Sequence, residues 1–295
     1  MRKLQLLILL LAMLAGICAC DKGSLGVYQP KMKIFQIYNE ADGHYLQEQW
    51  VWQGDLLSKI DYYRKNGNID YTQTYVYDGK RISRIESGDQ YSEFLYDGKA
   101  LTTINTYDGD NLLETYRFSY DKKQLSHINI TVYENNKFKN YLFNSFVPVN
   151  EEVVREYIAS SDSKREKYDF SAADIDLVWA DDNIANMKMQ IVRPDSIQHL
   201  TFSYIYDDNI NPRNGFFALF FDHQLLNDQP QYAFSSKNNA TNVLVTNEYG
   251  VHSNTIAHTY SYDYYKKFPT KVYSTFINVE TSRPDSSLLY SYHYQ

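Results

Sequence analysis

A repeated hairpin unit constrains the fold of this chain more than any other feature of its sequence. The unit has two aromatic residues two positions apart, a short polar turn, an aliphatic residue five positions after the second aromatic, and another aliphatic three further on. Residues two apart lie on one face of a β-strand, so each unit predicts an antiparallel hairpin. Four copies share these offsets: Trp50-Val51-Trp52 with Leu57 and Ile60, Tyr75-Val76-Tyr77 with Ile82 and Ile85, Phe94-Leu95-Tyr96 with Leu101 and Ile104, and Phe118-Ser119-Tyr120 with Leu125 and Ile128.

The turns and the composition agree with this interpretation. Asp78-Gly79-Lys80 and Asp97-Gly98-Lys99 join the two halves of their units, and glycine can take the positive φ that tight hairpins require. The chain contains 29 Tyr but only 12 Gly and 7 Pro, a balance typical of β-sheet. We therefore expect an all-β protein, an antiparallel meander of repeated hairpins that forms a large curved sheet or a half-closed barrel.

Residues 45–135 resemble the YD repeats of Rhs-type surface proteins, through Tyr77-Asp78-Gly79-Lys80 and the matching run at 96–99. The chain is also similar to a group of Bacteroidetes lipoproteins assigned to a domain of unknown function, and this resemblance implies a porin-like, partly open β-barrel. Three later segments carry it: Trp179 with Ile184 and Met187, Tyr204 to Asn209 ahead of Asn211-Pro212, and Tyr260 to Asp263 with Phe268 to Lys271. Lys267-Phe268 departs from the Gly-Tyr usual in that group.

The first nineteen residues have the parts of an export signal. Arg2 and Lys3 precede the run from Leu4 to Leu14, which is apolar except for Gln5 and too short to span a membrane. Ile17-Cys18-Ala19-Cys20 then resembles the lipobox of bacterial lipoproteins, and an ordinary signal peptide is the alternative. We expect residues 1–19 to be removed and Cys20 to be acylated, so that the membrane becomes a partner through the acyl chains.

The mature chain is predicted to hold a tether, 20–32, and a single β-meander domain, 33–295. Removal of Arg2 and Lys3 from the 29 basic residues leaves 27 against 36 acidic ones, a net charge of −9. This charge argues against nucleic acid or an anionic membrane surface as a partner, since both need a basic face. Cys18 and Cys20 are the only cysteines, so the mature domain has no disulfide. Residues 136–172 are irregular, with a possible short helix at 150–158, and Phe216 to Phe221 is expected to be buried.

The residues give little support to catalysis. The seven histidines show no metal-binding spacing, and no cofactor motif is present, so neither a metal nor a cofactor is predicted. Asp181-Asp182 and Asp207-Asp208 could serve as a glycosidase acid and base, although adjacent Asp residues more often form solvated turns.

The three tryptophans, Trp50, Trp52 and Trp179, occupy aromatic positions of the repeat. They could stack on sugar rings or could simply fill the core, and Trp50 is expected to lie nearer an edge than the other two. The sequence favours a lipid-anchored protein of the cell envelope, in the outer membrane, that binds or scaffolds without catalysis. The alternatives are a carbohydrate-binding surface lipoprotein, a carrier of an apolar ligand and a carbohydrate-active enzyme.

Overall fold

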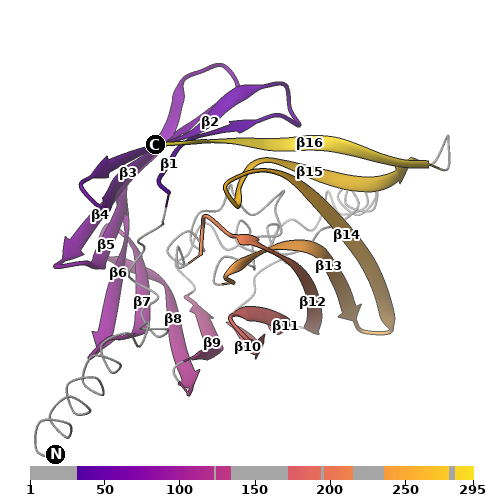
Figure 1. Cartoon of the computed structure of the whole chain (residues 1–295). Coiled ribbons are helices and arrows are strands. Elements are labelled where there is room, and N and C mark those ends of the chain that lie inside the picture. The colour runs from indigo at the N-terminus through magenta and orange to yellow at the C-terminus, as the bar shows by residue number, and fades with distance from the viewer. Residues whose placement is uncertain (1–31, 123, 134–171, 194–195, 215–235, 279–282) are drawn as a thin grey trace, which may run out of the picture.

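The computed structural model describes residues 32–122, 124–133, 172–193, 196–214, 236–278 and 283–295. Within these ranges sixteen antiparallel strands pair in chain order, and β1 pairs with β16 to close a barrel (Figure 1). The strands are β1 (Ile34–Asn39), β2 (Tyr45–Gln53), β3 (Leu56–Tyr63), β4 (Ile69–Asp78), β5 (Arg81–Ser87), β6 (Gln90–Asp97), β7 (Ala100–Asp108), β8 (Asn111–Asp121), β9 (Gln124–Val132), β10 (Ala172–Ala180), β11 (Asn183–Arg193), β12 (Ser196–Ile210), β13 (Asn238–Tyr249), β14 (His252–Tyr265), β15 (Phe268–Asn278) and β16 (Arg283–Tyr294).

The predicted all-β hairpin meander is confirmed, but the barrel is closed rather than half-closed. The four units seen in the sequence form the hairpins β2–β3, β4–β5, β6–β7 and β8–β9. The expected signal at 1–19, Cys20, most of the tether, the irregular stretch 136–171 and the run 216–221 lie outside the described residues.

Each repeated hairpin contains a register shift just before its second aromatic residue. In β4–β5 the shift falls between Val76 and Tyr77, so that Tyr77 pairs with Ile82 while Val76 pairs with Arg84. The extra residue, Ser83, donates its hydroxyl hydrogen to the carbonyl oxygen of Val76 at 3.2 Å. This β-bulge explains the spacing of five and then three: the extra residue must be skipped for both aliphatic residues to face the same side.

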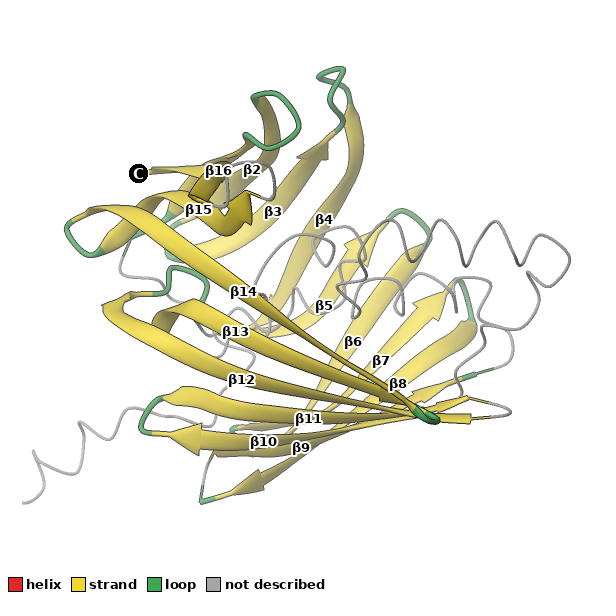
Figure 2. Ribbon diagram, turned by 90° about the vertical axis from the view of Figure 1, so that its right-hand side faces the viewer, coloured by secondary structure: helices red, strands yellow, loops and turns green. Residues whose placement is uncertain are grey.

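The Asp-Gly turns have the predicted backbone conformation. Gly79 and Gly98 have φ values of 64° and 56°, in the left-handed region that glycine tolerates best. The turn of β10–β11 places Asp181 at a φ of 55°, and the turn after β8 places Lys122 at 48°. These turns form one end of the barrel, which we call the Asp-Gly rim (Figure 2).

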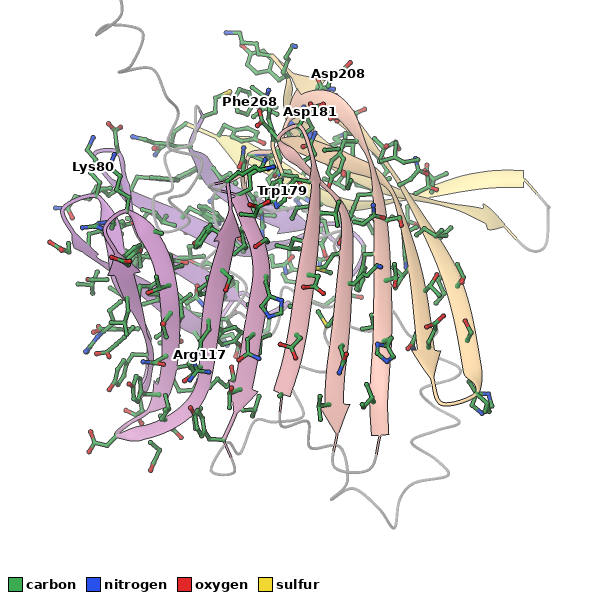
Figure 3. The ribbon with its side chains drawn as sticks, turned by 90° about the horizontal axis from the view of Figure 1, so that it is seen from below. Lys80, Arg117, Trp179, Asp181, Asp208 and Phe268 are labelled. Atoms are coloured by element: carbon green, nitrogen blue, oxygen red, sulfur yellow. The ribbon has the colours of Figure 1, made fainter. Side chains whose placement is uncertain are left out.

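The two faces of the wall differ in chemistry. One face carries the buried aliphatic and aromatic residues of the repeat, such as Leu57, Leu101 and Ile104, each 0% exposed. Side chains alternate along a strand, so the residues between them point to the other face. That outer face is mixed: Arg117 and Lys188 are exposed on it in mid-strand, and so are aliphatic residues such as Val76, Leu95 and Ile205. Arg117 is labelled on the wall in Figure 3. The core therefore lies inside the barrel.

Candidate functional site inside the barrel

A ring of side-chain hydrogen bonds runs around the inner face beside the Asp-Gly rim. In each hairpin an aromatic side chain on the even-numbered strand donates to a backbone carbonyl on the strand before it. Tyr96, for example, donates its hydroxyl hydrogen to the carbonyl oxygen of Ile82 at 2.8 Å. The other seven pairs in the described chain are Trp52–Ile34, Tyr77–Leu57, Tyr120–Leu101, Trp179–Leu125, Tyr206–Ile184, Tyr262–Ala240 and Tyr294–Pro269, at 2.5 to 2.8 Å.

Two of the candidate ligand residues belong to this ring. The indole nitrogens of Trp52 and Trp179 donate to backbone oxygens at 2.7 and 2.6 Å, and both side chains pack against the core. Tyrosine holds the same place in the neighbouring hairpins. The structure therefore gives both tryptophans a structural role in joining adjacent hairpins.

Trp50 does not lie near an exposed edge. Its side chain is 0% exposed, and its indole nitrogen donates to the carboxylate of Glu48 at 2.8 Å. The expectation of an edge position is therefore wrong. Trp50 is the first aromatic of its unit, and this position points into the core in every copy, whereas the second aromatic lies beside the rim.

Glu48 is the centre of a charged cluster in this apolar interior. The guanidinium of Arg213 lies 3.0 Å from its carboxylate, and the two side chains are 0% and 2% exposed. The same guanidinium stands over the Trp50 ring, 5.8 Å from the centroid. Tyr62 is the cross-strand neighbour of Glu48. We call Glu48, Trp50 and Arg213 the internal ion-pair site.

Arg213 reaches this site because the connection after β12 turns inward at the rim. Asn211 fastens that connection: its side-chain nitrogen donates to the carbonyl oxygen of Ser236 at 3.1 Å, and its side-chain oxygen accepts from the backbone nitrogen of Arg213 at 3.0 Å. The Ser236 hydroxyl also accepts from the backbone nitrogen of Ile184 at 3.0 Å. A network of small polar side chains thus aims the guanidinium at β2, six strands away around the barrel.

The electrostatics of the site favour the charged pair. Burial lowers the pKa of Arg213, but attraction to Glu48 together with contributions from Tyr292 and Tyr62 outweighs it, and the pKa is raised overall. Burial raises the pKa of Tyr292, while the neighbouring Arg213 partly offsets the rise. Arginine is therefore cationic at any physiological pH, and it holds a carboxylate opposite itself.

This arrangement suits structural bonding better than proton transfer. Glu48 accepts hydrogen bonds from both Trp50 and Arg213, one at each carboxylate oxygen. No three His, Cys, Asp or Glu side chains converge as metal ligands among the described residues. A buried ion pair of this kind adds little net stability, because the cost of removing two charges from water offsets much of their attraction.

The two acidic pairs considered as catalytic groups lie at the Asp-Gly rim and make structural contacts there. Asp181 and Asp182 form the β10–β11 turn, and Asp182 lies 3.5 Å from the Lys237 ammonium. Asp207 accepts hydrogen bonds from the backbone nitrogens of Asn209 and Asn239 at 2.9 and 3.2 Å, and from the Tyr264 hydroxyl. Figure 3 shows Asp181 and Asp208 at the same end of the barrel.

The outer wall carries its own charged and aromatic groups. Arg84 and Glu93 form an ion pair at 2.7 Å between β5 and β6. The Arg84 guanidinium also covers one face of Tyr91, which stacks on Tyr107 with 4.9 Å between ring centroids. These cross-strand contacts lie where a membrane-spanning barrel would present aliphatic side chains to lipid.

The internal ion-pair site was missed in the sequence. Glu48 sits two positions before the first aromatic of its unit, an inward-facing position, so a charge there already signals a buried partner. Arg213 follows the Asn211-Pro212 turn, which had been identified only as a resemblance. No local spacing links residues that are 165 positions apart.

Comparison with solved structures identifies the fold. A porin-like protein from Bacteroides vulgatus has a TM-score of 0.50 and 10% sequence identity, over 90% of this chain and 99% of its own. A porin-like protein from Bacteroides uniformis has a TM-score of 0.50 and 11% identity, over 92% of this chain and 99% of its own. No family model and no curated protein matches the sequence. The porin-like barrel expected from the sequence is thereby confirmed as a fold.

Proposed function

We propose that this protein is a lipid-anchored component of a bacterial cell envelope, in the outer membrane, that binds or scaffolds without catalysis and does not conduct solutes through its barrel. The observation that carries the proposal is the polarity of the wall. A porin has an apolar outer band and a polar, water-filled lumen. Here buried apolar residues line most of the inside, with the Glu48–Arg213 pair among them, and the outer face carries charged residues in mid-strand. Exposed aliphatic residues such as Val76 and Leu95 lie on that outer face as well.

The energetic cost of charged side chains facing lipid supports a barrel wall that lies outside the hydrocarbon of the membrane. Arg or Lys facing lipid near the bilayer midplane costs about 2–4 kcal/mol for each residue. Arg84, Arg117 and Lys188 all lie on the outer face in mid-strand, together with Glu93 and Asp176. Within the described ranges no helix has the length and hydropathy of a membrane span. The acyl chains on Cys20 would supply the attachment instead.

Two measurements test the proposal. Palmitate labelling in cells should mark the wild type and Cys18→Ser but not Cys20→Ser, and Cys20→Ser should be either soluble or uncleaved. The purified wild type should give no conductance steps in a planar lipid bilayer. Label in Cys20→Ser would overturn the anchor, and regular conductance steps would overturn the non-conducting barrel.

A second candidate function is transport of an apolar ligand inside the barrel, and the apolar inner face favours it. The inner side chains are already buried, so a ligand would have to displace packed groups. A fluorescent fatty acid should therefore bind weakly or not at all. Saturable, stoichiometric binding would favour the carrier over the scaffold.

A further inference from the structure

The two ends of the barrel differ in charge among the described residues. The charge of the Asp-Gly rim is balanced, because basic and acidic residues occur in equal number in or beside its turns. Arg213 is not counted, since its charge is paired inside the barrel. The residues counted are Lys33, Lys80, Arg81, Lys99, Lys122, Lys237, Lys266 and Lys267, and Asp55, Asp78, Asp97, Asp121, Asp181, Asp182, Asp207 and Asp208.

The opposite rim is acidic. Its turns join the odd-numbered strands to the even-numbered strands that follow them. In the described ranges the basic residues in or beside those turns are Arg64, Lys65, Arg193 and Arg283, half as many as the acidic ones, and Arg64 is already paired with Asp70 at 2.5 Å. The acidic residues in or beside those turns are Glu40, Asp42, Asp70, Glu86, Asp89, Asp108, Asp110 and Glu248.

The chain enters the barrel at the balanced rim. β1 begins at Ile34, whose carbonyl oxygen accepts from Trp52 at the end of β2. The ammonium of Lys33 donates to the carbonyl oxygen of Gly54 in the β2–β3 turn at 2.6 Å. Gln295 at the other end of the chain donates its backbone hydrogen to Lys33 at 3.0 Å. The attachment point of the tether is therefore fixed firmly to the Asp-Gly rim.

We infer that the barrel stands on the membrane with its Asp-Gly rim toward the lipid headgroups and its acidic rim facing away. The inference rests on the proposed anchor at Cys20. The thirteen residues from Cys20 to Lys33 span at most about 45 Å when fully extended. The wall is about 25 Å high for strands of ten residues at a tilt of about 40°. In the reverse orientation more than half of the extended tether would have to run back along this wall, whereas in the proposed orientation it joins the rim to the membrane directly.

Charge acts in the same direction as the tether. Membrane surfaces with anionic lipids repel acidic groups over about a Debye length, roughly 8–10 Å at physiological salt. The acidic rim turned toward the lipid would meet this repulsion, whereas the balanced rim would not. The partner of the Asp-Gly rim is therefore the headgroup layer of the bilayer itself.

Site-specific fluorescence quenching tests the orientation, because the sulfur of Cys20 is consumed by acylation and the mature chain has no other cysteine. Lys80→Cys labels the Asp-Gly rim and Asp110→Cys labels the acidic rim, and both positions are exposed turn residues. Each lipidated variant is placed in vesicles of phosphatidylethanolamine and phosphatidylglycerol that carry a nitroxide on the headgroup.

We expect quenching to be several-fold stronger for the label at 80 than for the label at 110. Equal quenching, or stronger quenching at 110, would overturn the orientation while leaving the anchor intact. The same labels on Cys20→Ser supply the unanchored baseline. Failure of the lipidated variants to remain with the vesicles would instead overturn the anchor, and the orientation with it.

Discussion

The guanidinium of Arg213 lies 3.0 Å from the carboxylate of Glu48, across the interior of the barrel and 165 positions away in the chain. The pair ties the connection after β12 to β2. Both side chains are at most 2% exposed, so bulk water could not solvate either charge if its partner were removed. Loss of one charge would leave the other buried alone.

Our first prediction follows from this geometry. Arg213→Met should reduce the free energy of unfolding by about 3–5 kcal/mol, as removal of one partner of a buried pair does. Glu48→Leu should cost a similar amount. The double variant should recover most of the loss, because it buries no isolated charge. Urea unfolding of the three variants measures the effects, and simple addition of the two single losses would contradict the coupling.

The second prediction concerns the hydrogen-bond ring. Tyr96→Phe keeps the ring in place and removes only the bond to Ile82, so it should cost about 0.5–1.5 kcal/mol. Tyr96→Ala also removes the packed ring and should cost about 3–5 kcal/mol. Tyr265→Phe is the matched control, because that side chain is 54% exposed, and it should be neutral. An unchanged free energy of unfolding for Tyr96→Phe would show that the hydrogen bond from Tyr96 to Ile82 does not stabilise the barrel.

Alkaline pH should weaken the barrel through these same tyrosines. Burial raises the pKa of Tyr77 to about 12, and the hydrogen bond to Leu57 only partly offsets the rise. A tyrosine in the unfolded chain titrates near 10. Between these two values the native state retains a proton that the unfolded state has lost, so stability is complete below about pH 10 and falls as pH rises toward 12.

Urea unfolding at a series of pH values measures this loss, and tyrosinate absorbance follows the titration. Tyr77→Phe should show a shallower decline than the wild type over the same interval. Burial raises the pKa values of Tyr96, Tyr120 and Tyr206 as well, so the decline should persist in the variant. Identical slopes in the two proteins would contradict the assignment to Tyr77.

A fourth prediction concerns backbone strain at Gly79. An added Cβ there would meet no atom within 4 Å, so any cost comes from the φ of 64° alone. Gly79→Val should lose about 1–3 kcal/mol. Gly79→Asn should lose much less, because Asn tolerates this conformation, and Asp181 already adopts it in an equivalent turn. Thermal melts of the two variants would refute the strain argument if they coincided.

The first half of the barrel was predictable because its repeats are uninterrupted and local. The serine or threonine of the bulge was present in the sequence as well, six positions after the second aromatic, but it was overlooked. In the structure Ser58, Ser83, Thr102 and Ser126 each donate to the carbonyl between their two aromatics. A serine or threonine six positions after the second aromatic could have predicted the bulge.

Closure of the barrel was harder to predict. The aromatic pair Tyr292 and Tyr294 on β16 pairs with β1, at the other end of the domain, rather than with a strand that follows it in sequence. The β12–β13 hairpin is interrupted by a long connection, so Tyr206 pairs with Ala240 rather than with a residue five positions on. Periodicity detects neighbours in sequence, and these partners are neighbours only in space.

The last prediction reverses our expectation for Trp50. Its ring is 0% exposed, donates to Glu48 and lies beneath Arg213. Trp50→Ala should therefore lower the free energy of unfolding by about 3–5 kcal/mol or more, the usual cost of emptying a buried large aromatic site. Trp179→Ala should cost less than Trp50→Ala, since its ring is only partly buried. Trp50→Phe is the companion variant: it preserves most of the packing, removes the hydrogen bond to Glu48 and should fold with a smaller loss.

A glycan array on the wild type and Trp50→Phe completes the comparison. Because the indole already faces Glu48 and the core, we expect the two proteins to give the same array profile, whether or not either binds a sugar. Glycan binding by the wild type that disappears in a well-folded Trp50→Phe would place a ligand at Trp50. It would also require the inner face of the barrel to open, contrary to the packing that surrounds this ring.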